Sequence, residues 1–171
     1  MPLLLGSFNF LTSNIPKRGI DVLVEIDTPG HTAIIAEAYP AFIACSEATP
    51  WGTYAAEPPA GQLRIASVAA TNFTATLLSS VARLLPSKYF STGGDEVNTK
   101  CYQEDKSTQT ALKQLGWTIE HALNVFTQAT HSALVSEGKT PVVWEGSLFE
   151  LLLSQTLCSK NSLKKWSWIT T

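Results

Sequence analysis

Several features that mark common classes of protein are missing from this sequence of 171 residues. It has no apolar run of about 18 residues, the length that a transmembrane helix needs. The net charge is only -2, so no strongly basic surface is expected for nucleic acid or an anionic membrane. No glycine-rich phosphate loop follows any predicted strand, which disfavours a doubly wound nucleotide-binding sheet.

Cysteine is scarce as well, with Cys45, Cys101 and Cys158. Three thiols cannot all pair within one chain, and their spacing has no metal-ligand pattern. The N-terminus lacks the basic start and the clear cleavage site of a signal peptide. The cellular compartment therefore stays open. Asn72-Phe73-Thr74 is a glycosylation sequon, usable only if the chain is secreted.

What the sequence does contain is a regular alternation of apolar patterns. A β-branched run in Gly19–Asp27 predicts a strand buried on both faces, and three- and four-residue spacings predict helices. In chain order we expect a strand at 19–27, a short helix at 33–38, a loop at 45–61, a helix at 62–85, a strand at 88–92, a loop at 99–108, a helix at 108–137 that Gly116 bends or splits, and a strand at 141–144.

This repeated βα order implies a parallel sheet with helices outside it. Polar or aromatic residues follow each strand, as in the sites of a (β/α)8 barrel. A full barrel takes at least about 200 residues, so three strands amount to part of one. The sequence therefore predicts an α/β fold, a partial (β/α)8 TIM barrel of about three βα units.

The most conspicuous of these strand ends is Ser91-Thr92-Gly93-Gly94-Asp95-Glu96. The two glycines lack a Cβ and let a ligand or another backbone come close. Asp95 and Glu96 can share one pocket only if the chain turns between them, because successive strand side chains point to opposite faces. For this motif alone, an acidic surface turn is an equally good interpretation.

The other strand ends offer further candidates. Asp27 and His31 flank Thr-Pro-Gly after the first strand, and Trp144 and Glu145 end the third. Glu25 lies inside the first strand, where an unpaired charge is costly to bury. We expect Glu25 to face a polar barrel interior or to pair with a cation. His121 and His131, by contrast, are expected to be ordinary surface or packing residues of the long helix.

Three motifs in this order resemble the catalytic barrel of family 20 glycoside hydrolases, the β-N-acetylhexosaminidases, with the fungal branch most similar. They are Asp-Thr-Pro-Gly-His at 27–31, Ser-Thr-Gly-Gly-Asp-Glu at 91–96 and Val-Val-Trp-Glu at 142–145. The resemblance spans 19–145, about the third to fifth strands of the barrel. It implies a retaining mechanism in which the substrate's own 2-acetamido oxygen is the nucleophile. No cofactor and no metal is implied.

The resemblance also assigns roles to residues. The acid/base glutamate falls on Glu96, and the aspartate that orients the acetamido group falls on Asp95. Asp27 and His31 match a hydrogen-bonding pair beside this dyad. Trp144 matches an aromatic wall of the acetamido pocket, and Glu145 is expected to bind substrate.

This chain also departs from the family pattern. Ser91 stands where many members have histidine, and Gly146 where many have a second carboxylate. The sugar-binding arginine of the first barrel strand is absent, as are the Tyr, Asp and Trp of later strands. The alternative to an enzyme is therefore a catalytically incomplete fragment that binds sugar weakly at most.

The expected organisation is a poorly defined lead-in at 1–18, a partial barrel at 19–146 and a tail outside the family at 147–171. Expected substrates are β-linked GlcNAc or GalNAc glycosides or chitooligosaccharides, with no nucleic acid and no membrane as partner. By resemblance, full-length members can be homodimers. The location implied is secreted, vacuolar or lysosomal.

Overall fold

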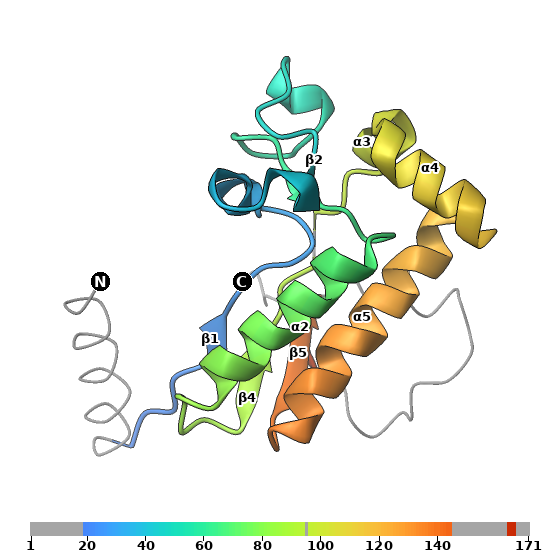
Figure 1. Ribbon diagram of the computed structural model, residues 1–171. Helices are drawn as coiled ribbons and strands as arrows, with labels where there is room; N and C mark the ends of the chain where they lie inside the picture. Colours follow the sequence, from blue (N-terminus) through green and yellow to red (C-terminus); the bar gives the residue numbers. More distant parts are fainter. Residues whose placement is uncertain (1–18, 95, 145–163, 167–171) are drawn as a thin grey trace.

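The computed structural model describes residues 19–94, 96–144 and 164–166. The expected lead-in at 1–18 lies outside the described residues, as does the expected tail apart from 164–166. Within the described part, one parallel sheet and its helices lie beside a smaller lobe of short helices and a two-stranded ribbon (Figure 1).

The main sheet contains four strands in the order β1 (Val24–Glu25), β4 (Tyr89–Ser91), β5 (Thr140–Trp144) and β6 (Lys164–Trp166). All three pairings are parallel. The expected parallel arrangement of the first three strands is thus confirmed. The strand β6 adds a fourth, in a segment where the sequence pattern predicted no βα unit.

Two long helices connect these strands and pack against each other on one side of the sheet (Figure 1). They are α2 (Val68–Ala82) and α5 (Ile119–Ser136). Beneath them lies a core cluster of Leu78, Ala82, Leu85, Phe90 and Leu134, all fully or almost fully buried. Through Phe90 this core holds β4, the strand that leads to the glycine pair, against the two helices.

The first strand differs from its prediction. β1 is short, and its residues alternate between exposed and half-buried instead of being buried on both faces. Ile20 is 57% exposed and Leu23 is 38% exposed. The reason is position: among the described strands, β1 has β4 as its only neighbour and forms the edge of the sheet.

The helix predicted from residue 62 begins later, at Val68. Gln62–Leu63 instead forms strand β3, which pairs antiparallel with β2 (Ile43–Ala44). Ser67 ends the preceding segment by capping α2, its hydroxyl oxygen accepting from the Ala70 amide. Within α2, Val68 is 67% exposed while Ala70 and Leu78 are fully buried.

The prediction of a loop at 99–108 is wrong, because helices form over this segment. Asn98 caps α3 (Thr99–Glu104) and Asp105 caps α4 (Lys106–Leu115), each by accepting a backbone N–H. Gly116 then splits the long helical pattern, with φ of 68° at the C-cap of α4.

The smaller lobe contains the remaining short elements. They are three 3-10 helices, η2 (Ala33–Glu37), η3 (Pro40–Phe42) and η4 (Trp51–Thr53), together with β2, β3, α3 and α4. Their shared core includes Ile43, Leu63, Cys101 and Tyr102, and it extends to Phe126 of α5. The lobe is therefore packed onto the long helix, next to the ends of the sheet strands.

Candidate active site

The turn after β4 is built by two glycines with positive φ, Gly93 at 64° and Gly94 at 92°. A Cβ on Gly93 would lie 2.0 Å from Asp27 Oδ1 and 2.9 Å from the Asp27 Cα. Only glycine fits this close approach of two strand ends. The Gly94 amide donates to Asp27 Oδ1 at 2.7 Å. Asp27 therefore fixes the backbone just before residues 95 and 96.

Thr92 joins three strand ends through its backbone. Its amide donates to the Val142 carbonyl at 3.0 Å, and its carbonyl accepts from the Thr28 amide at 2.9 Å. One residue further on, the Gly93 carbonyl accepts from the Trp144 amide at 3.1 Å. The ends of β1, β4 and β5 are thereby held at one edge of the sheet, as barrel sites require.

His31 and Glu96 form the most direct contact of the site, with 2.6 Å between Nε2 and Oε2. Asp27 Oδ2 lies 4.0 Å from the same imidazole nitrogen. The His31 and Glu96 side chains are 32% and 35% exposed, so both are open to a ligand from solvent. A carboxyl group within hydrogen-bond distance of an imidazole, at a partly open strand end, can act as a general acid or base.

A pocket adjoins this pair on the side of the smaller lobe. It is lined by Tyr54, Ala55 and Gln62 together with His31 and Glu96, and by further residues of the 56–61 loop. The long loop predicted at 45–61 thus contributes a wall to the space beside the carboxylate. This wall borders the Glu96 carboxylate on the side of the smaller lobe.

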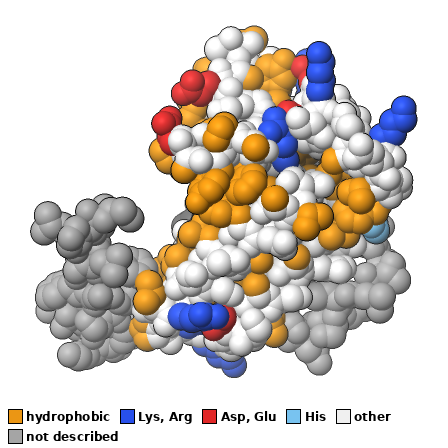
Figure 2. Space-filling model, viewed as in Figure 1, with side chains coloured by type: hydrophobic (Ala, Val, Ile, Leu, Met, Phe, Trp, Pro, Cys, Tyr) orange, Lys and Arg blue, Asp and Glu red, His pale blue; other side chains and the backbone are white. Residues whose placement is uncertain are grey.

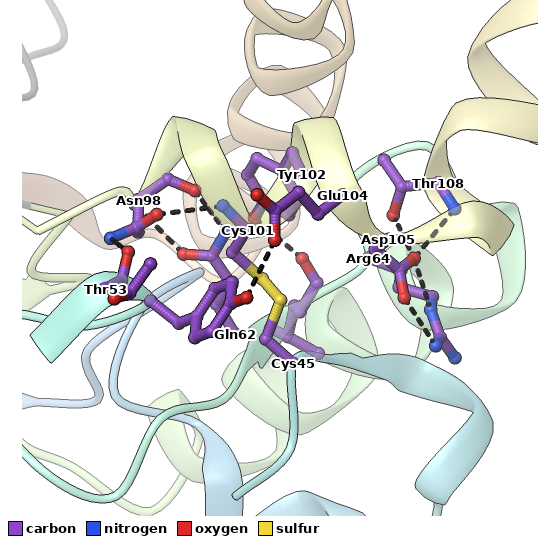
Figure 3. Close-up of a disulfide and its surroundings, with 12 residues drawn as sticks. Cys45, Thr53, Gln62, Arg64, Asn98, Cys101, Tyr102, Glu104, Asp105 and Thr108 are labelled. Atoms are coloured by element: carbon purple, nitrogen blue, oxygen red, sulfur yellow. Dashed lines mark hydrogen bonds and ion pairs between the residues drawn. A yellow bond between two sulfur atoms is a disulfide. The ribbon is translucent and has the colours of Figure 1, made fainter. Parts of the chain in front are cut away.

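The loop wall is braced against α3 by a disulfide and a pair of reciprocal hydrogen bonds (Figure 3). Cys45 pairs with Cys101, a choice that the sequence left open. The Gln62 Nε2 donates to the Asn98 carbonyl at 2.8 Å, and the Asn98 amide donates to Gln62 Oε1 at 3.0 Å. The brace attaches the wall to the segment that directly follows Glu96.

Glu25 lies on the face of the sheet away from the helices, in agreement with the expected barrel interior, because its neighbours Val24 and Ile26 pack against the helix-side core. The contact that the structure shows for its carboxylate is a hydroxyl group and not the cation that was the other expectation. The Ser91 hydroxyl donates to its carboxylate. The two residues are register partners on the adjacent strands β1 and β4, which places their side chains together. Ser91 therefore has a defined partner within the sheet.

His131 is a packing residue, one of the two roles expected for it, whereas its contact with the end of β4 was not predicted. It is 8% exposed, and its Nε2 lies 3.1 Å from Thr92 Oγ1. Burial lowers the pKa of His131 to about 4, so the imidazole is neutral. A helical signal was available, because His131 follows the buried Leu123 by about two turns and shares its face.

Two predicted site residues, Asp95 and Glu145, lie outside the described residues. The structure brings together Asp27, His31 and Glu96, and it joins the backbone of Trp144 to the same turn. In the part of the chain that the structure describes, no group of three or more His, Cys, Asp or Glu residues could hold a metal ion. The same part contains no helix long and apolar enough to cross a membrane.

The fold and site together define a class: part of a parallel α/β barrel with an imidazole–carboxyl pair at its strand ends. The catalytic domain of glycosyl hydrolase family 20 matches residues 15–170. The chain therefore belongs to glycosyl hydrolase family 20.

Proteins named as β-hexosaminidases are similar to this chain in sequence. A β-hexosaminidase of Arthroderma benhamiae is 38% identical over 131 residues, covering 75% of this chain and 21% of the relative. The β-hexosaminidase subunit alpha of Rattus norvegicus is 33% identical over 131 residues, covering 75% of this chain and 24% of the relative. The chain thus spans less than a quarter of the length of these relatives.

Solved structures agree on the barrel fold. The chitobiase of Flavobacterium johnsoniae superposes with a TM-score of 0.71 at 25% identity, over 95% of this chain and 24% of that one. A family 20 exo-β-N-acetylglucosaminidase of Vibrio harveyi, solved with N-acetylglucosamine, has a TM-score of 0.71 at 21% identity, over 95% of this chain and 25% of that one.

Proposed function

We propose that this chain carries the acid/base part of the active site of a retaining β-N-acetylhexosaminidase. Such an enzyme hydrolyses terminal non-reducing N-acetyl-D-hexosamine residues from β-N-acetylhexosaminides. The observation that carries the proposal is the 2.6 Å contact between His31 and Glu96 at the carboxyl ends of parallel strands. Membership of family 20 and the names of the similar proteins support it.

In this proposal Glu96 protonates the departing glycosidic oxygen and later activates water. Its contact with His31 holds the carboxyl group in place. Asp95 orients the acetamido group, whose oxygen attacks the anomeric carbon, and stabilises the charge that develops on the oxazolinium-like intermediate. Trp144 forms an apolar wall for the acetamido group, and Glu145 binds the sugar.

The leaving group lies against the side of the site where His31 and Glu96 face the smaller lobe. An acid must lie within hydrogen-bond reach of the oxygen that it protonates, so the departing half of the substrate lies on the side of Glu96. Tyr54, Ala55 and Gln62 line that side. Suitable substrates are β-linked GlcNAc or GalNAc glycosides and chitooligosaccharides, which places the activity in carbohydrate metabolism, including chitin degradation.

The pairing of Cys45 with Cys101 favours an oxidising compartment, since cytosolic thiols are normally kept reduced. This chemistry supports the secreted, vacuolar or lysosomal location that the family implies. As in full-length members of the family, a homodimer is the assembly that we expect of a complete protein.

The second candidate is a catalytically incomplete unit that binds sugar weakly at most. The chain spans less than a quarter of the length of the curated relatives named above, whose remaining length lies outside the match. In the described part of the chain β1 is a sheet edge, with Ile20 and Leu23 exposed beside it. Unpaired edges and exposed apolar residues favour aggregation. We therefore expect the isolated chain to be marginally stable and inactive.

The test compares the isolated chain with a completed barrel, in which residues 19–146 replace the matching segment of a whole family 20 enzyme. Both are assayed on a chromogenic β-N-acetylglucosaminide. We expect turnover by the completed barrel and none by the isolated chain. Robust turnover by a soluble, cooperatively melting isolated chain would exclude the incomplete unit. A folded but inactive completed barrel would overturn the proposed function.

A further inference from the structure

The sequon Asn72-Phe73-Thr74 lies in α2, and its two functional residues have opposite environments. Asn72 is exposed, whereas Thr74 is only 1% exposed. The Thr74 hydroxyl donates to the Ala70 carbonyl at 2.8 Å. The amide side chain of this sequon is thus free to carry a large group, while the hydroxyl belongs to the helix core.

The surface around Asn72 has room for a bulky substituent. The helix positions three and four residues away are its surface neighbours, and here they hold no side chain larger than valine: Val68, Ala69, Ala75 and Thr76. Val68 itself is 67% exposed. No long side chain from these positions folds over the amide.

The same side of the molecule presents apolar side chains to solvent. The Tyr39 ring stacks on Phe42 at 5.2 Å and contacts Phe73, the middle residue of the sequon, at 4.8 Å between centroids. Tyr39 remains 46% exposed. Figure 2 shows hydrophobic side chains gathered where η2 and η3 lie against α2. An apolar face of this kind favours association unless something polar covers it.

The compartment needed for N-glycosylation agrees with the disulfide. Cys45 pairs with Cys101 in the lobe that packs beside α2, and such a bond persists where the secretory route provides oxidising conditions. The sequon and the disulfide are independent observations, since they share no residue.

We propose that Asn72 is an N-glycosylation site and that its glycan covers part of the apolar face of Tyr39 and Phe73. The donor is an oligosaccharide linked to a lipid through a diphosphate. The Asn72 Nδ2 forms a bond to the anomeric carbon of the first sugar while the bond from that carbon to the diphosphate oxygen breaks. One amide proton passes to a base of the transferase, and the lipid diphosphate leaves.

The transfer precedes the folding of α2. In the folded helix the Thr74 hydroxyl is buried and hydrogen-bonded to the Ala70 carbonyl, so a transferase cannot bind it. On the nascent chain both residues are accessible. Once α2 has formed, the glycan remains outside because Asn72 is exposed.

The experiment is translation of the full chain, preceded by a cleavable secretory leader, in the presence of endoplasmic-reticulum microsomes. Added protease marks the translocated fraction, and peptide N-glycosidase removes any glycan and leaves aspartate at position 72 for mass spectrometry. We expect one glycan on the translocated chain. Neither Asn72→Gln nor Thr74→Val should carry one, whereas Thr74→Ser keeps the hydroxyl and should retain it.

Thr74→Val and Thr74→Ser alter the same buried position, so they separate loss of the acceptor hydroxyl from disturbance of the helix. A translocated chain with unmodified Asn72 would overturn the site, as would a Thr74→Val chain that is still glycosylated. Chain that is folded and oxidised before it meets the transferase should stay unmodified. Equal modification of that chain would overturn the order of events.

Discussion

The hydroxyl of Thr92 lies 3.1 Å from Nε2 of His131, joining the strand that leads to the glycine pair to the helix behind it. The backbone carbonyl of Thr92 accepts a hydrogen bond from the Thr28 amide, and its backbone amide donates one to the Val142 carbonyl. A neutral imidazole inside this packing supports the strand end. A charged imidazole would lack a counterion among the contacts described, and burial opposes its formation.

The first prediction concerns acid stability in the completed barrel. The pKa of His131 is lowered by burial to about 4, below the value of about 6.5 in the unfolded chain. Stability from this residue is therefore fully present above pH 6.5 and is lost as the pH falls towards 4. The loss amounts to at most about 3 kcal/mol.

Denaturant unfolding at several pH values between 7 and 4 measures this dependence. His131→Leu should be less stable at pH 7 but should show a smaller loss on acidification. His121→Leu, at an exposed position of the same helix, is the control and should keep the parental slope. An unchanged slope in His131→Leu would contradict the prediction.

The second prediction contrasts two glycines with nearly the same φ. Gly93→Ala places a Cβ against Asp27, whereas a Cβ on Gly116 meets nothing within 4 Å. Gly116→Ala should cost only the strain of a left-handed residue, roughly 1–2 kcal/mol. Gly93→Ala should cost more and should also reduce activity, because Asp27 and the turn must move apart. Comparison of unfolding free energies and kcat/KM in the completed barrel tests this, and equal effects would refute it.

The third prediction concerns the brace between the loop wall and α3. Replacing Cys45 and Cys101 together by alanine should lower the unfolding free energy by about 2–5 kcal/mol, since the bond closes a long loop of the unfolded chain. A reductant should lower the melting temperature of the parent completed barrel to about that of the double variant. The double variant serves as the control and should not respond to it. A parent that melts identically with and without reductant would argue against the brace.

The fourth prediction distinguishes the proposed roles of Glu96 and Asp95. Glu96→Gln removes the proton donor, so substrates with poor leaving groups should lose about 10²- to 10⁴-fold in kcat/KM. A nitrophenyl glycoside needs less protonation and should lose less. Asp95→Asn should slow both substrates, because it weakens stabilisation of the intermediate whatever the leaving group.

Glu120→Gln provides a matched control for that comparison, because Glu120 is an exposed carboxylate in the first turn of α5 and does not line the pocket beside Glu96. It should leave the leaving-group dependence unchanged. The role assignment would be reversed if Glu96→Gln affected both substrates equally while Asp95→Asn spared the activated one. The ratio kcat/KM is the suitable quantity, since it reports the steps through the first irreversible one.

Local patterns in the sequence were sufficient to predict the order of the three main strands and their parallel arrangement. β-branched runs and helical spacing depend on neighbouring residues alone. The motifs at the strand ends likewise indicated which residues would meet, and the structure places Asp27, His31 and Glu96 together.

The tertiary structure alone decided the remaining features, because they depend on contacts between distant residues. The pairing of Cys45 with Cys101 requires two elements 56 residues apart to pack together. The short strand at Gln62 forms because Ile43–Ala44 lies beside it, although its own pattern suits a helix. The burial of His131 against Thr92 arises where α5 crosses the sheet. Spacing can place a residue on a helix face, but only packing determines what that face meets.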